Sequence, residues 1–385
     1  MSLLEEKCLN IESKVVHGHS MFDPLTGAIT TPIYQSATFR HPGLYETTGY
    51  DYSRLQNPTR EELEKTIASL ENGKHGFAFS SGMAAITTLI KLFNPGEHII
   101  LSDDLYGGTY RICEEIYKRY GLEFEYVDTS SIDNLKAAIK SNTKGAFIET
   151  PTNPMMKVTD IREASKICKE SGVLLIIDNT FLTPYFQRPL ELGADVVVHS
   201  ATKYLGGHND TLCGLAVVNN DELAEEIKLI HKSEGAVVSP FDCYLIIRGI
   251  KTLAVRLERH EENAKLVAEF LKNHESVDKI YYTGDTDNPY YDVMKKQSSG
   301  FGAMISFTVK KVETVEKVLK SVKLITFAES LGGVESLITY PVVQTHGAIP
   351  EEIRNAIGVT DKLLRLSVGI ENVNDIISDL NQALI

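Results

Sequence analysis

The amino-acid sequence predicts an α/β fold, in which a large, doubly wound and mostly parallel β-sheet is followed by a smaller C-terminal α+β domain. Apolar runs of strand length alternate with helix-like segments over roughly residues 59–218. Runs such as Val173–Asp178 and Val196–Ser200 are mostly apolar, as strands buried on both faces of a parallel sheet are. After residue 220 the alternation stops, which indicates a second domain. Alternating β and α segments favour a parallel sheet covered by helices on both faces.

The first 58 residues are expected to form an irregular N-terminal arm. They are rich in Gly, Pro, Thr and Tyr and show no sustained periodicity, apart from a short helix predicted near Leu4–Ser13. Irregular segments of this length are usually functional or interfacial. At the end of the arm, Thr59 and Glu62 predict a capping box, and the helix that it starts should end at Asn72 and Gly73.

We assign residues 59–250 to the first domain. A helix is expected after Ser81, where Gly82 opens an apolar run that ends near Phe93. The remaining elements expected here are the helices Gly108–Tyr120, Asp133–Lys140 and Asp160–Ser171 and the strands Gly76–Phe79, Ile99–Ser102, Phe124–Val127, Ala146–Glu149, Val173–Asp178, Val196–Ser200 and Leu215–Val218.

Residues 251–385 are assigned to the smaller domain. The chain leads into it through a helix at Asp221–Lys232 and a long periodic segment, Pro240–His274, which reads as one or two helices despite Gly249. No further parallel strand is expected, so the strands of this domain are predicted to be antiparallel. They are Phe301–Val309, Leu324–Phe327 and Leu363–Val368, with helices at Thr314–Ser321, Glu351–Gly358 and Val373–Leu384.

Composition and charge narrow the function. With 43% hydrophobic and 24% charged residues, the chain has the composition of an ordinary globular protein. A formal charge of −13 disfavours surfaces for nucleic acid or anionic membranes, which need basic patches. We expect small-molecule partners, no secretory signal, no membrane helix and no metal site. The five cysteines are an odd number without CxxC spacing, which favours a reducing cytoplasm over a disulfide framework.

Polar residues gather where the two central strands end. Asp178 closes one strand, and Ser200, Thr202 and Lys203 follow the other. Parallel strands joined by a crossover expose their carboxyl ends at one rim, so these side chains are expected to meet there. The set suits an aldehyde cofactor that carries a phosphate: the lysine binds the aldehyde, the acid pairs with a ring nitrogen, and the hydroxyls hold the phosphate together with helix-terminal amides. Gly82, at a helix start, lets the backbone approach that phosphate.

Eight motifs, in order along most of the chain, carry a family resemblance. They are YSRLQNPT (52–59), SSGMAA (80–85), DLYGGTYR (104–111), ETPTNP (149–154), IIDNT (176–180), SATKYLGGH (200–208), SLGGVESL (330–337) and LRLSVGIE (364–371). With them the chain resembles the trans-sulfuration family, which comprises cystathionine γ-synthase, cystathionine γ- and β-lyases, methionine γ-lyase and O-acetylhomoserine sulfhydrylase. The resemblance implies an aspartate-aminotransferase-like fold (fold type I) and pyridoxal 5′-phosphate as the cofactor.

The resemblance also implies roles for single residues. Lys203, Tyr106 and Asp178 would be catalytic: Lys203 binds the cofactor and moves protons, Asp178 pairs with the ring nitrogen, and Tyr106 stacks on the ring. Tyr52 and Arg54 would reach the cofactor phosphate of a neighbouring subunit, in a homotetramer built as a dimer of dimers. The cofactor-binding residues implied in this way are Tyr52, Arg54, Gly82, Met83, Tyr106, Asp178, Ser200, Thr202 and Lys203.

For the substrate, the resemblance implies that Arg365 binds the α-carboxylate, since a guanidinium supplies the two-pronged donor that a carboxylate needs. Glu335, with Asp51 near the arm tyrosine, would hold the distal ammonium of cystathionine by opposite charge, a contact that methionine cannot use. The substrate-binding residues implied in this way are Asn153, Ser330, Arg365, Arg111 and Glu335.

The expected reaction is the cleavage or formation of a C–S bond in cystathionine or a related sulfur amino acid, of the γ-lyase or γ-synthase type. Methionine γ-lyases usually carry a cysteine where this chain has Gly108, which favours a cystathionine enzyme. Cystathionine β-lyase, methionine γ-lyase and O-acetylhomoserine sulfhydrylase stay open. In other classes, the lack of GxGxxG and HExxH motifs disfavours a dehydrogenase and a metal hydrolase, and a non-catalytic protein that binds pyridoxal phosphate is the alternative.

Overall fold

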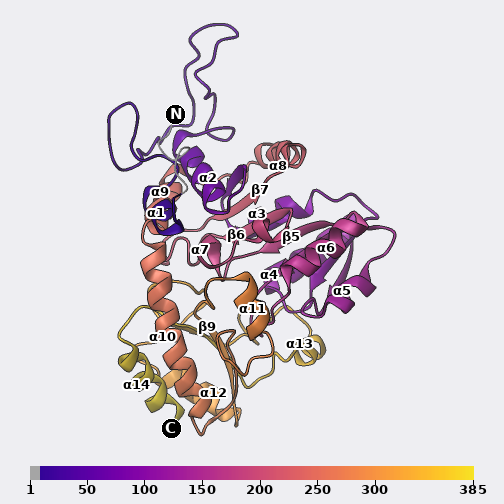
Figure 1. Ribbon diagram of the computed structural model, residues 1–385, viewed down its shortest axis with the longest axis vertical. Coiled ribbons are helices and arrows are strands. Elements are labelled where there is room, and N and C mark those ends of the chain that lie inside the picture. The colour runs from indigo at the N-terminus through magenta and orange to yellow at the C-terminus, as the bar shows by residue number, and fades with distance from the viewer. Residues whose placement is uncertain (1–8) are drawn as a thin grey trace.

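The computed structural model describes residues 9–385, which contain two β-sheets flanked by helices. Figure 1 shows the larger sheet in the upper part of the molecule and the smaller sheet below it, with the long helix α10 (Leu253–Asn273) running down one side. The two sheets fall within residues 75–218 and 277–367. The predicted α/β fold class is confirmed. The domain boundaries predicted after residues 58 and 250 remain predictions.

The large sheet has seven strands in the order β1-β7-β6-β5-β4-β2-β3. Strand β7 pairs antiparallel with both of its neighbours, and the other strand pairs are parallel. The prediction of a mostly parallel sheet is therefore confirmed. The strands are β1 (His75–Phe79), β2 (His98–Ser102), β3 (Glu123–Val127), β4 (Thr143–Glu149), β5 (Leu174–Asp178), β6 (Val196–Ser200) and β7 (Gly214–Val218).

Both faces of this sheet are buried. In β2, Ile99 and Leu101 pack into a cluster with side chains of α3, α4 and α8, whereas Ile100 packs on the other face with α5 and α6. Successive side chains of a strand point to opposite faces, so a strand covered on both sides reads as an unbroken apolar run. The helices of this part are α2 (Pro58–Leu70), α3 (Gly82–Ile90), α4 (Gly107–Glu115), α5 (Ile132–Ala138), α6 (Ile161–Ser171), α7 (Thr183–Phe186) and α8 (Asp221–Glu234).

Helices α3 and α4 end earlier than the sequence predicts. Helix α3 ends at Ile90 rather than near Phe93, because the amides of Leu92 and Phe93 donate to carbonyls three residues back, as in a tightened last turn. The predicted helix Gly108–Tyr120 is α4 followed by a separate 3-10 helix, Tyr117–Tyr120.

The predicted capping box at Thr59 and Glu62 is wrong. The cap of α2 is Asn57, whose side-chain oxygen accepts hydrogen bonds from the amides of Thr59 at 3.0 Å and Arg60 at 3.4 Å. Pro58 occupies the first helical position, where its missing N–H costs nothing. The helix therefore begins one residue before the residue that the motif marks as its cap.

The two residues of the supposed capping box hold the arm instead. The Thr59 hydroxyl accepts a hydrogen bond from the amide of Tyr34 at 2.9 Å, and the Glu62 carboxylate accepts one from the amide of Ser20 at 2.7 Å. Helix α1 (Ile11–His17) is the only helix of the described part of the arm. Of the predicted helix Leu4–Ser13, positions 4–8 lie outside the described residues, and α1 begins later than predicted.

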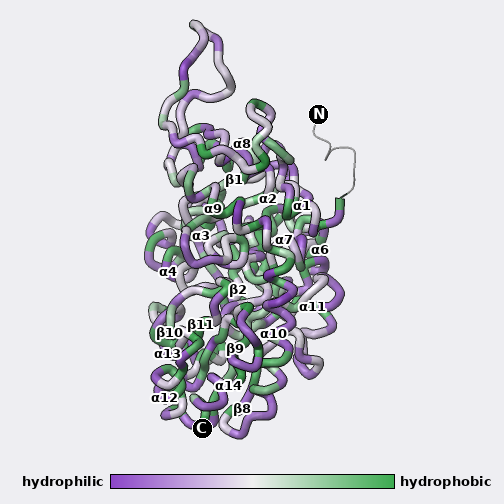
Figure 2. The backbone as a smooth tube through the Cα atoms, turned by 90° about the vertical axis from the view of Figure 1, so that its left-hand side faces the viewer, coloured by the Kyte–Doolittle hydropathy of each residue, from purple (hydrophilic) through white to green (hydrophobic). Residues whose placement is uncertain are grey.

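Beyond α1 the arm leaves the body of the protein. In Figures 1 and 2, two views at a right angle, its long loops project away from the helices and the sheet. Their contacts are sparse: one isolated bridge joins Thr38 to Tyr52. Large apolar side chains on these loops are exposed, among them Leu25, Ile29, Leu44, Tyr45 and Tyr52.

The smaller sheet has five strands in the order β10-β11-β12-β9-β8. Its pairs are antiparallel except that β10 pairs parallel with β11, which corrects the prediction of purely antiparallel strands. The strands are β8 (Val277–Tyr281), β9 (Met304–Val309), β10 (Thr326–Phe327), β11 (Leu337–Thr339) and β12 (Leu363–Ser367). The helices are α9 (Pro240–Ile250), α10, α11 (Tyr291–Gln297), α12 (Glu313–Ser321), α13 (Glu351–Ile357) and α14 (Val373–Leu384).

Three of these elements are absent from the sequence prediction. Strand β8 carries exposed polar residues at two of its five positions, β11 has only three residues, and α11 only seven, so none has a clear periodic signal. The segment predicted as one or two helices is two, α9 and α10. Within residues 9–385, no helix is long and apolar enough to cross a membrane.

Candidate active site

A cavity of about 330 Å³ opens at the carboxyl ends of β4, β5 and β6, where loops of the smaller sheet close over the rim of the larger one. This is the edge where parallel sheets bind ligands. Most of the site residues predicted from the sequence line it. They are Gly82, Met83, Tyr106, Asn153, Asp178, Ser200, Thr202, Lys203, Ser330 and Arg365.

Asp178 lies at the end of β5 and is buried. Its Oδ1 accepts hydrogen bonds from the amide of Thr180 at 3.0 Å and from the Thr180 hydroxyl at 2.6 Å, which fixes the carboxyl group. Burial raises the pKa of Asp178, and the hydrogen bonds from Thr180 oppose that shift. A cationic ring nitrogen placed against this carboxyl group would favour its ionised form.

Lys203 follows β6 and points into the same cavity. Its Nζ donates a hydrogen bond to the Ser330 hydroxyl at 3.0 Å. Burial lowers the pKa of Lys203 to about 8, and the positive charge of Arg365 acts in the same direction. A lowered pKa makes the neutral amine accessible near neutral pH, and only the neutral amine can attack an aldehyde.

The start of α3 forms a seat for an anion at one end of the cavity. Its cap, Ser81, accepts a hydrogen bond from the amide of Ala84 at 3.1 Å, which leaves the amides of Gly82 and Met83 without partners in the helix. A Cβ at Gly82 would lie 2.8 Å from the Cβ of Ser200, so only glycine lets the helix start come this close. Backbone amides and a helix dipole together bind phosphate groups well.

Tyr106 lies at the start of α4, and its ring borders the cavity. Its amide donates a hydrogen bond to Oε2 of Glu149, at the end of β4, at 2.9 Å. Burial, and then the neighbouring Asp178, raise the pKa of Glu149 well above its usual value. A Cβ at Gly108 would collide with the ring of Tyr106 and lie 3.0 Å from Sδ of Met83, so a larger residue there would move the ring.

Arg365, in the middle of β12, is almost completely buried. Its Nη1 donates to Oδ1 of Asn153 at 2.6 Å, and its Nη2 donates to the carbonyl of Ser330 at 3.2 Å. Burial lowers the pKa of Arg365 to about 10, so it stays charged at neutral pH. A buried cation held by neutral acceptors is costly unless an anion joins it, which suits a ligand carboxylate.

Ser330 carries backbone strain at this site. Its φ of 106° lies in the region that side chains rarely adopt, at a cost of about 1–3 kcal/mol. The strained turn lets one residue contact two others, since its hydroxyl accepts from Lys203 and its carbonyl accepts from Arg365. Strain of this kind is typical of sites where geometry matters more than local stability.

Pyridoxal phosphate fits this set of groups. The cavity offers an amine with a lowered pKa, a fixed carboxyl group for a ring nitrogen, an aromatic ring and a helix start free of side chains for a phosphate. The sequence profile of the family described as Cys/Met metabolism PLP-dependent enzymes, where PLP is pyridoxal phosphate, matches residues 12–385. The chain belongs to this family.

Relatives in the family span more than one reaction. Over 375 residues the chain is 52% identical to a cystathionine γ-synthase/O-acetylhomoserine (thiol)-lyase of Bacillus subtilis, covering 97% of this chain and 96% of the relative. It is 50% identical to a cystathionine β-lyase of Lactococcus lactis, covering 97% and 99%. The crystal structure of a cystathionine γ-lyase from Lactobacillus plantarum matches with a TM-score of 0.96 at 45% identity, covering 97% and 98%.

Membership in this family confirms several predictions. The chain is a pyridoxal-phosphate-dependent enzyme of the trans-sulfuration family with an amino-acid substrate, and its large sheet belongs to fold type I. The alternative of a non-catalytic binding protein is therefore set aside. The similar identities to a γ-synthase and a β-lyase leave the reaction of this enzyme to be argued from its own residues.

Glu329 lines the cavity and is absent from the sequence prediction, which named Glu335 instead. Glu335 is exposed outside the cavity, where its carboxylate accepts a hydrogen bond from Asn209 at 2.8 Å. Glu329 directly precedes the motif that begins at Ser330, and its negative charge acts to raise the pKa of Lys203 against the larger effect of burial. The sequence shows that Glu329 is next to Ser330, but this proximity does not distinguish it from Glu335.

Three further predicted residues lie outside the cavity within one chain. Arg111 is exposed on α4. Tyr52 and Arg54 lie on the arm, where the guanidinium of Arg54 stands 5.9 Å from the centre of the Tyr52 ring and donates to the carbonyl of Lys232 at 2.5 Å. Their predicted contact with the cofactor of a neighbouring subunit stays a prediction.

A second, more open cavity of about 870 Å³ adjoins the first at the phosphate end. The two share Thr202, Leu212, Glu329 and Ser330 in their walls. Among the described residues, no lysine or arginine lines the second cavity, and the first contains only Lys203 and Arg365. Within residues 9–385, the cations that line the cavity with the phosphate seat are thus Lys203 and Arg365, and the open side of the seat has none.

Proposed function

We propose that the enzyme acts on cystathionine and cleaves its γ C–S bond, releasing cysteine, 2-oxobutyrate and ammonia. The observation that carries the proposal is the pair of opposite charges in the cavity wall, Arg365 and Glu329. Arg365 suits the α-carboxylate of an amino acid, and Glu329 suits a distal ammonium. Cystathionine carries both groups, whereas methionine has no distal ammonium.

The position of Gly108 also supports cystathionine rather than methionine as the substrate. Methionine γ-lyases usually carry a cysteine there, and in this chain any side chain at Gly108 would collide with the ring of Tyr106. The relatives named as a cystathionine β-lyase and a cystathionine γ-synthase support cystathionine as the ligand, and the solved relative named as a cystathionine γ-lyase supports γ-cleavage. Synthesis of cystathionine from an activated homoserine ester is the alternative direction, since it would use the same residues.

Each residue of the cavity has a separate proposed role in the reaction. When bound, the cofactor supplies an electron sink that stabilises negative charge at the substrate α-carbon. Asp178, whose carboxyl group is fixed by Thr180, would hold the ring nitrogen in its protonated form through the negative charge of its carboxylate. Lys203 removes the proton from the α-carbon and moves protons at the β-carbon, which its lowered pKa allows near pH 8. Tyr106, which lines the cavity, would donate a proton to the leaving sulfur.

We further propose that a second copy of the chain completes the site. The phosphate seat adjoins an open cavity without lysine or arginine in its described lining, and the projecting arm carries Tyr52 and Arg54. Arg54 of a second copy would supply the missing positive charge. By family resemblance, the assembly is a homotetramer made of two such dimers.

A reducing cytoplasm is the location we propose, since the four described cysteines are buried as free thiols.

Product analysis by mass spectrometry tests the reaction. Cystathionine added to the cofactor-loaded enzyme should give cysteine, 2-oxobutyrate and ammonia. Homocysteine with pyruvate and ammonia would assign β-cleavage instead. If neither pair forms, the proposal fails, and methionine or an activated homoserine ester becomes the substrate to test.

A variant of Glu329 tests the choice of substrate. Glu329→Gln should raise the KM of cystathionine by about tenfold, since a hydrogen bond to a charged group contributes about 1.5–3 kcal/mol. The KM of a substrate without a distal ammonium should stay within about twofold. Glu335→Gln, which removes an acid outside the cavity, is the matched control and should change neither value. Equal effects of Glu329→Gln on both substrates would contradict the role of this charge.

A further inference from the structure

Two irregular loops carry residues that border the cavity. Residues 103–106 join β2 to α4 and end in Tyr106. Residues 150–160 join β4 to α6 and contain Asn153, whose Oδ1 accepts the hydrogen bond from Arg365 at 2.6 Å. Because both loops lie outside the strands of the sheet, contacts between side chains and backbone must fix one against the other.

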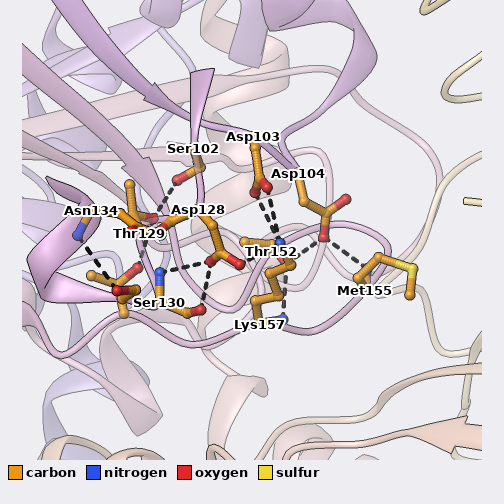
Figure 3. Close-up of polar contacts among 12 residues, drawn as sticks. Ser102, Asp103, Asp104, Asp128, Thr129, Ser130, Asn134, Thr152, Met155 and Lys157 are labelled. Carbon is orange, nitrogen blue, oxygen red and sulfur yellow. Dashed lines mark hydrogen bonds and ion pairs between the residues drawn. The ribbon is translucent and has the colours of Figure 1, made fainter. Parts of the chain in front are cut away.

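The carboxyl group of Asp104 makes such a contact (Figure 3). Its Oδ2 accepts hydrogen bonds from the Thr152 hydroxyl at 2.5 Å and from the amide of Met155 at 3.0 Å. The side chain of Asp104 is fully buried, and its Oδ1 has no partner among the described residues. A buried carboxyl group without a cation costs stability, so its presence between the loops calls for a compensating role.

We propose that Asp104 is a positioning residue for the substrate carboxylate: it holds the segment 152–155 so that Asn153 can orient Arg365. The two groups that Asp104 accepts from, on Thr152 and Met155, lie on either side of Asn153 along the chain. Asn153 and Arg365 are both nearly fully buried, so a displaced Asn153 leaves the guanidinium without one of its acceptors. This inference rests on the proposed role of Arg365.

The protonation behaviour of Asp104 supports a role through shape rather than charge. Burial raises the pKa of Asp104 to about 7, and its hydrogen bonds from Thr152 and Met155 oppose the shift. A proton on Oδ1, the atom without a partner, leaves Oδ2 free to accept both hydrogen bonds. An amide of the same shape can therefore replace the carboxyl group.

Asp103, the preceding residue, provides a matched control. Its carboxylate pairs with Nζ of Lys157 at 3.0 Å, and Lys157 also pairs with Asp128 at 2.9 Å (Figure 3). These groups are partly exposed, and ion pairs of that kind contribute little to stability. Neutralising Asp103 leaves Lys157 with its second acid and leaves the hydrogen bonds of Asp104 in place.

Glycine is the probe for the test, since it carries the amino and carboxylate groups of a substrate but no side chain. In the cofactor-loaded enzyme, Asp104→Ala should raise the Kd of glycine, measured from the cofactor absorbance, by about tenfold. The KM of the amino-acid substrate should rise in parallel, while kcat changes less than about threefold. Asp104→Asn and Asp103→Asn should both stay within about twofold of the native values.

Either of two results with the Asp104 variants would overturn the inference: a native Kd for glycine in Asp104→Ala, or glycine binding in Asp104→Asn that is as weak as in Asp104→Ala. If Asp104→Ala does not fold, Thr152→Val removes one of the two donors that Asp104 accepts from and should raise the same Kd. An unchanged Kd in a folded Thr152→Val enzyme would equally overturn it.

A double-mutant cycle with Asn153→Ala separates positioning from general stability. Asn153→Ala alone should weaken glycine binding, and Asp104→Ala should add little in that background, because both changes act through the same contact. Full additivity would assign Asp104 to stability alone and overturn the inference. If Asn153→Ala and Arg365→Lys both leave glycine binding unchanged, the proposed substrate role of Arg365 fails instead.

Discussion

The active site has an inner half and an outer half, and a single chain contributes more of the expected residues to the inner half than to the outer half. The inner half contains the buried residues Asp178 and Arg365 and the half-buried Lys203, and all three have hydrogen-bond partners within the chain. The outer half holds the phosphate seat at Gly82, which opens into a cavity without lysine or arginine in its described lining. Arg54, the cation predicted for this seat, belongs to the arm and lies outside both cavities, where it donates to the carbonyl of Lys232. The fold of one chain thus prepares the chemistry, whereas we propose that a second copy supplies the cation for the phosphate seat.

Burial explains why the inner half can be complete before any ligand binds. The lowered pKa of Lys203 and the raised pKa of Asp178 have desolvation as their largest cause, and desolvation is a property of the packed chain. The arm has little packing of its own, and its exposed apolar side chains, such as Leu44 and Tyr45, suit a contact surface. The two halves should therefore respond differently to mutation.

Removing the amine of the inner half should have the largest effect. Lys203→Ala lacks both the group that binds the cofactor aldehyde and the base at the α-carbon, so turnover should fall by about 10³-fold or more. Lys203→Arg keeps a positive charge but no nucleophilic amine and should be equally inactive. Turnover is measured with saturating cofactor, alongside thermal unfolding to show that both variants fold. Native turnover in Lys203→Ala would contradict the assignment.

Removing the cation of the outer half should affect the cofactor rather than the chemistry. Arg54→Ala should raise the Kd of pyridoxal phosphate by about tenfold or more, the loss expected for a charged hydrogen bond. Arg40→Ala changes another exposed arginine of the arm and should leave that Kd unchanged.

Mixing the two variants locates the Arg54 contact. If each arm serves the neighbouring subunit, a mixed dimer of Lys203→Ala and Arg54→Ala chains has one intact site, and a statistical mixture should regain about a quarter of native activity at limiting cofactor. Activity no higher than the sum of the separate variants would place Arg54 at the site of its own chain.

Much of the fold follows from local pattern. The strands of the large sheet are buried on both faces, so Ile99–Ser102 and Val173–Asp178 read as apolar runs with turn signals between them. The smaller sheet is harder to predict from the sequence. Strand β11 is only three residues long, and the parallel pairing of β10 with it is a tertiary contact that no sequence signal indicates. The cap of α2 shows the same limit: Thr59 matches a motif, but its hydroxyl binds the arm.

The active site divides along a similar line. Asp178 and Lys203 are predictable because they end strands whose carboxyl ends must share a rim. The sequence does not predict the roles of three other acids, because these roles depend on which loops fold against each other. The three are Glu149, Asp104 and Glu329. Sequence proximity alone cannot decide whether the acid at 329 or that at 335 faces the cavity, since strain at Ser330 sets the direction of the turn.

The pH dependence of cofactor uptake sharpens the account of the inner half. With a pKa of about 8, Lys203 is mostly protonated below pH 8, and only its neutral form attacks the aldehyde. The rate at which the apo-enzyme takes up pyridoxal phosphate, followed by absorbance, should rise about tenfold per pH unit below pH 8 and level off above it.

Two variants should move this inflection in opposite directions. Arg365→Gln removes a charge that lowers the pKa of Lys203, so the inflection should move to higher pH. Glu329→Gln removes a charge that raises this pKa, so the inflection should move to lower pH. Shifts of the same sign in both variants would contradict the electrostatic account.

The smallest expected effect concerns the thermal stability of the protein and its dependence on the protonation of Asp104. The pKa of Asp104 is raised to about 7 in the folded chain, from a usual value of 3.8. Its stabilising contribution is therefore fully present below pH 3.8 and is lost as the pH rises to 7, because the folded state must then give up a proton that it binds more tightly than the unfolded state does.

Asp104→Asn has no such proton, so its Tm relative to the native enzyme should rise by a few degrees between pH 5 and pH 8. Asp103→Asn should show a smaller trend, because Lys157 opposes the effect of burial on that carboxylate. A difference in Tm between Asp104→Asn and the native enzyme that stays constant across this range would mean that Asp104 is already ionised, and that the inner half carries a buried negative charge rather than a neutral acid.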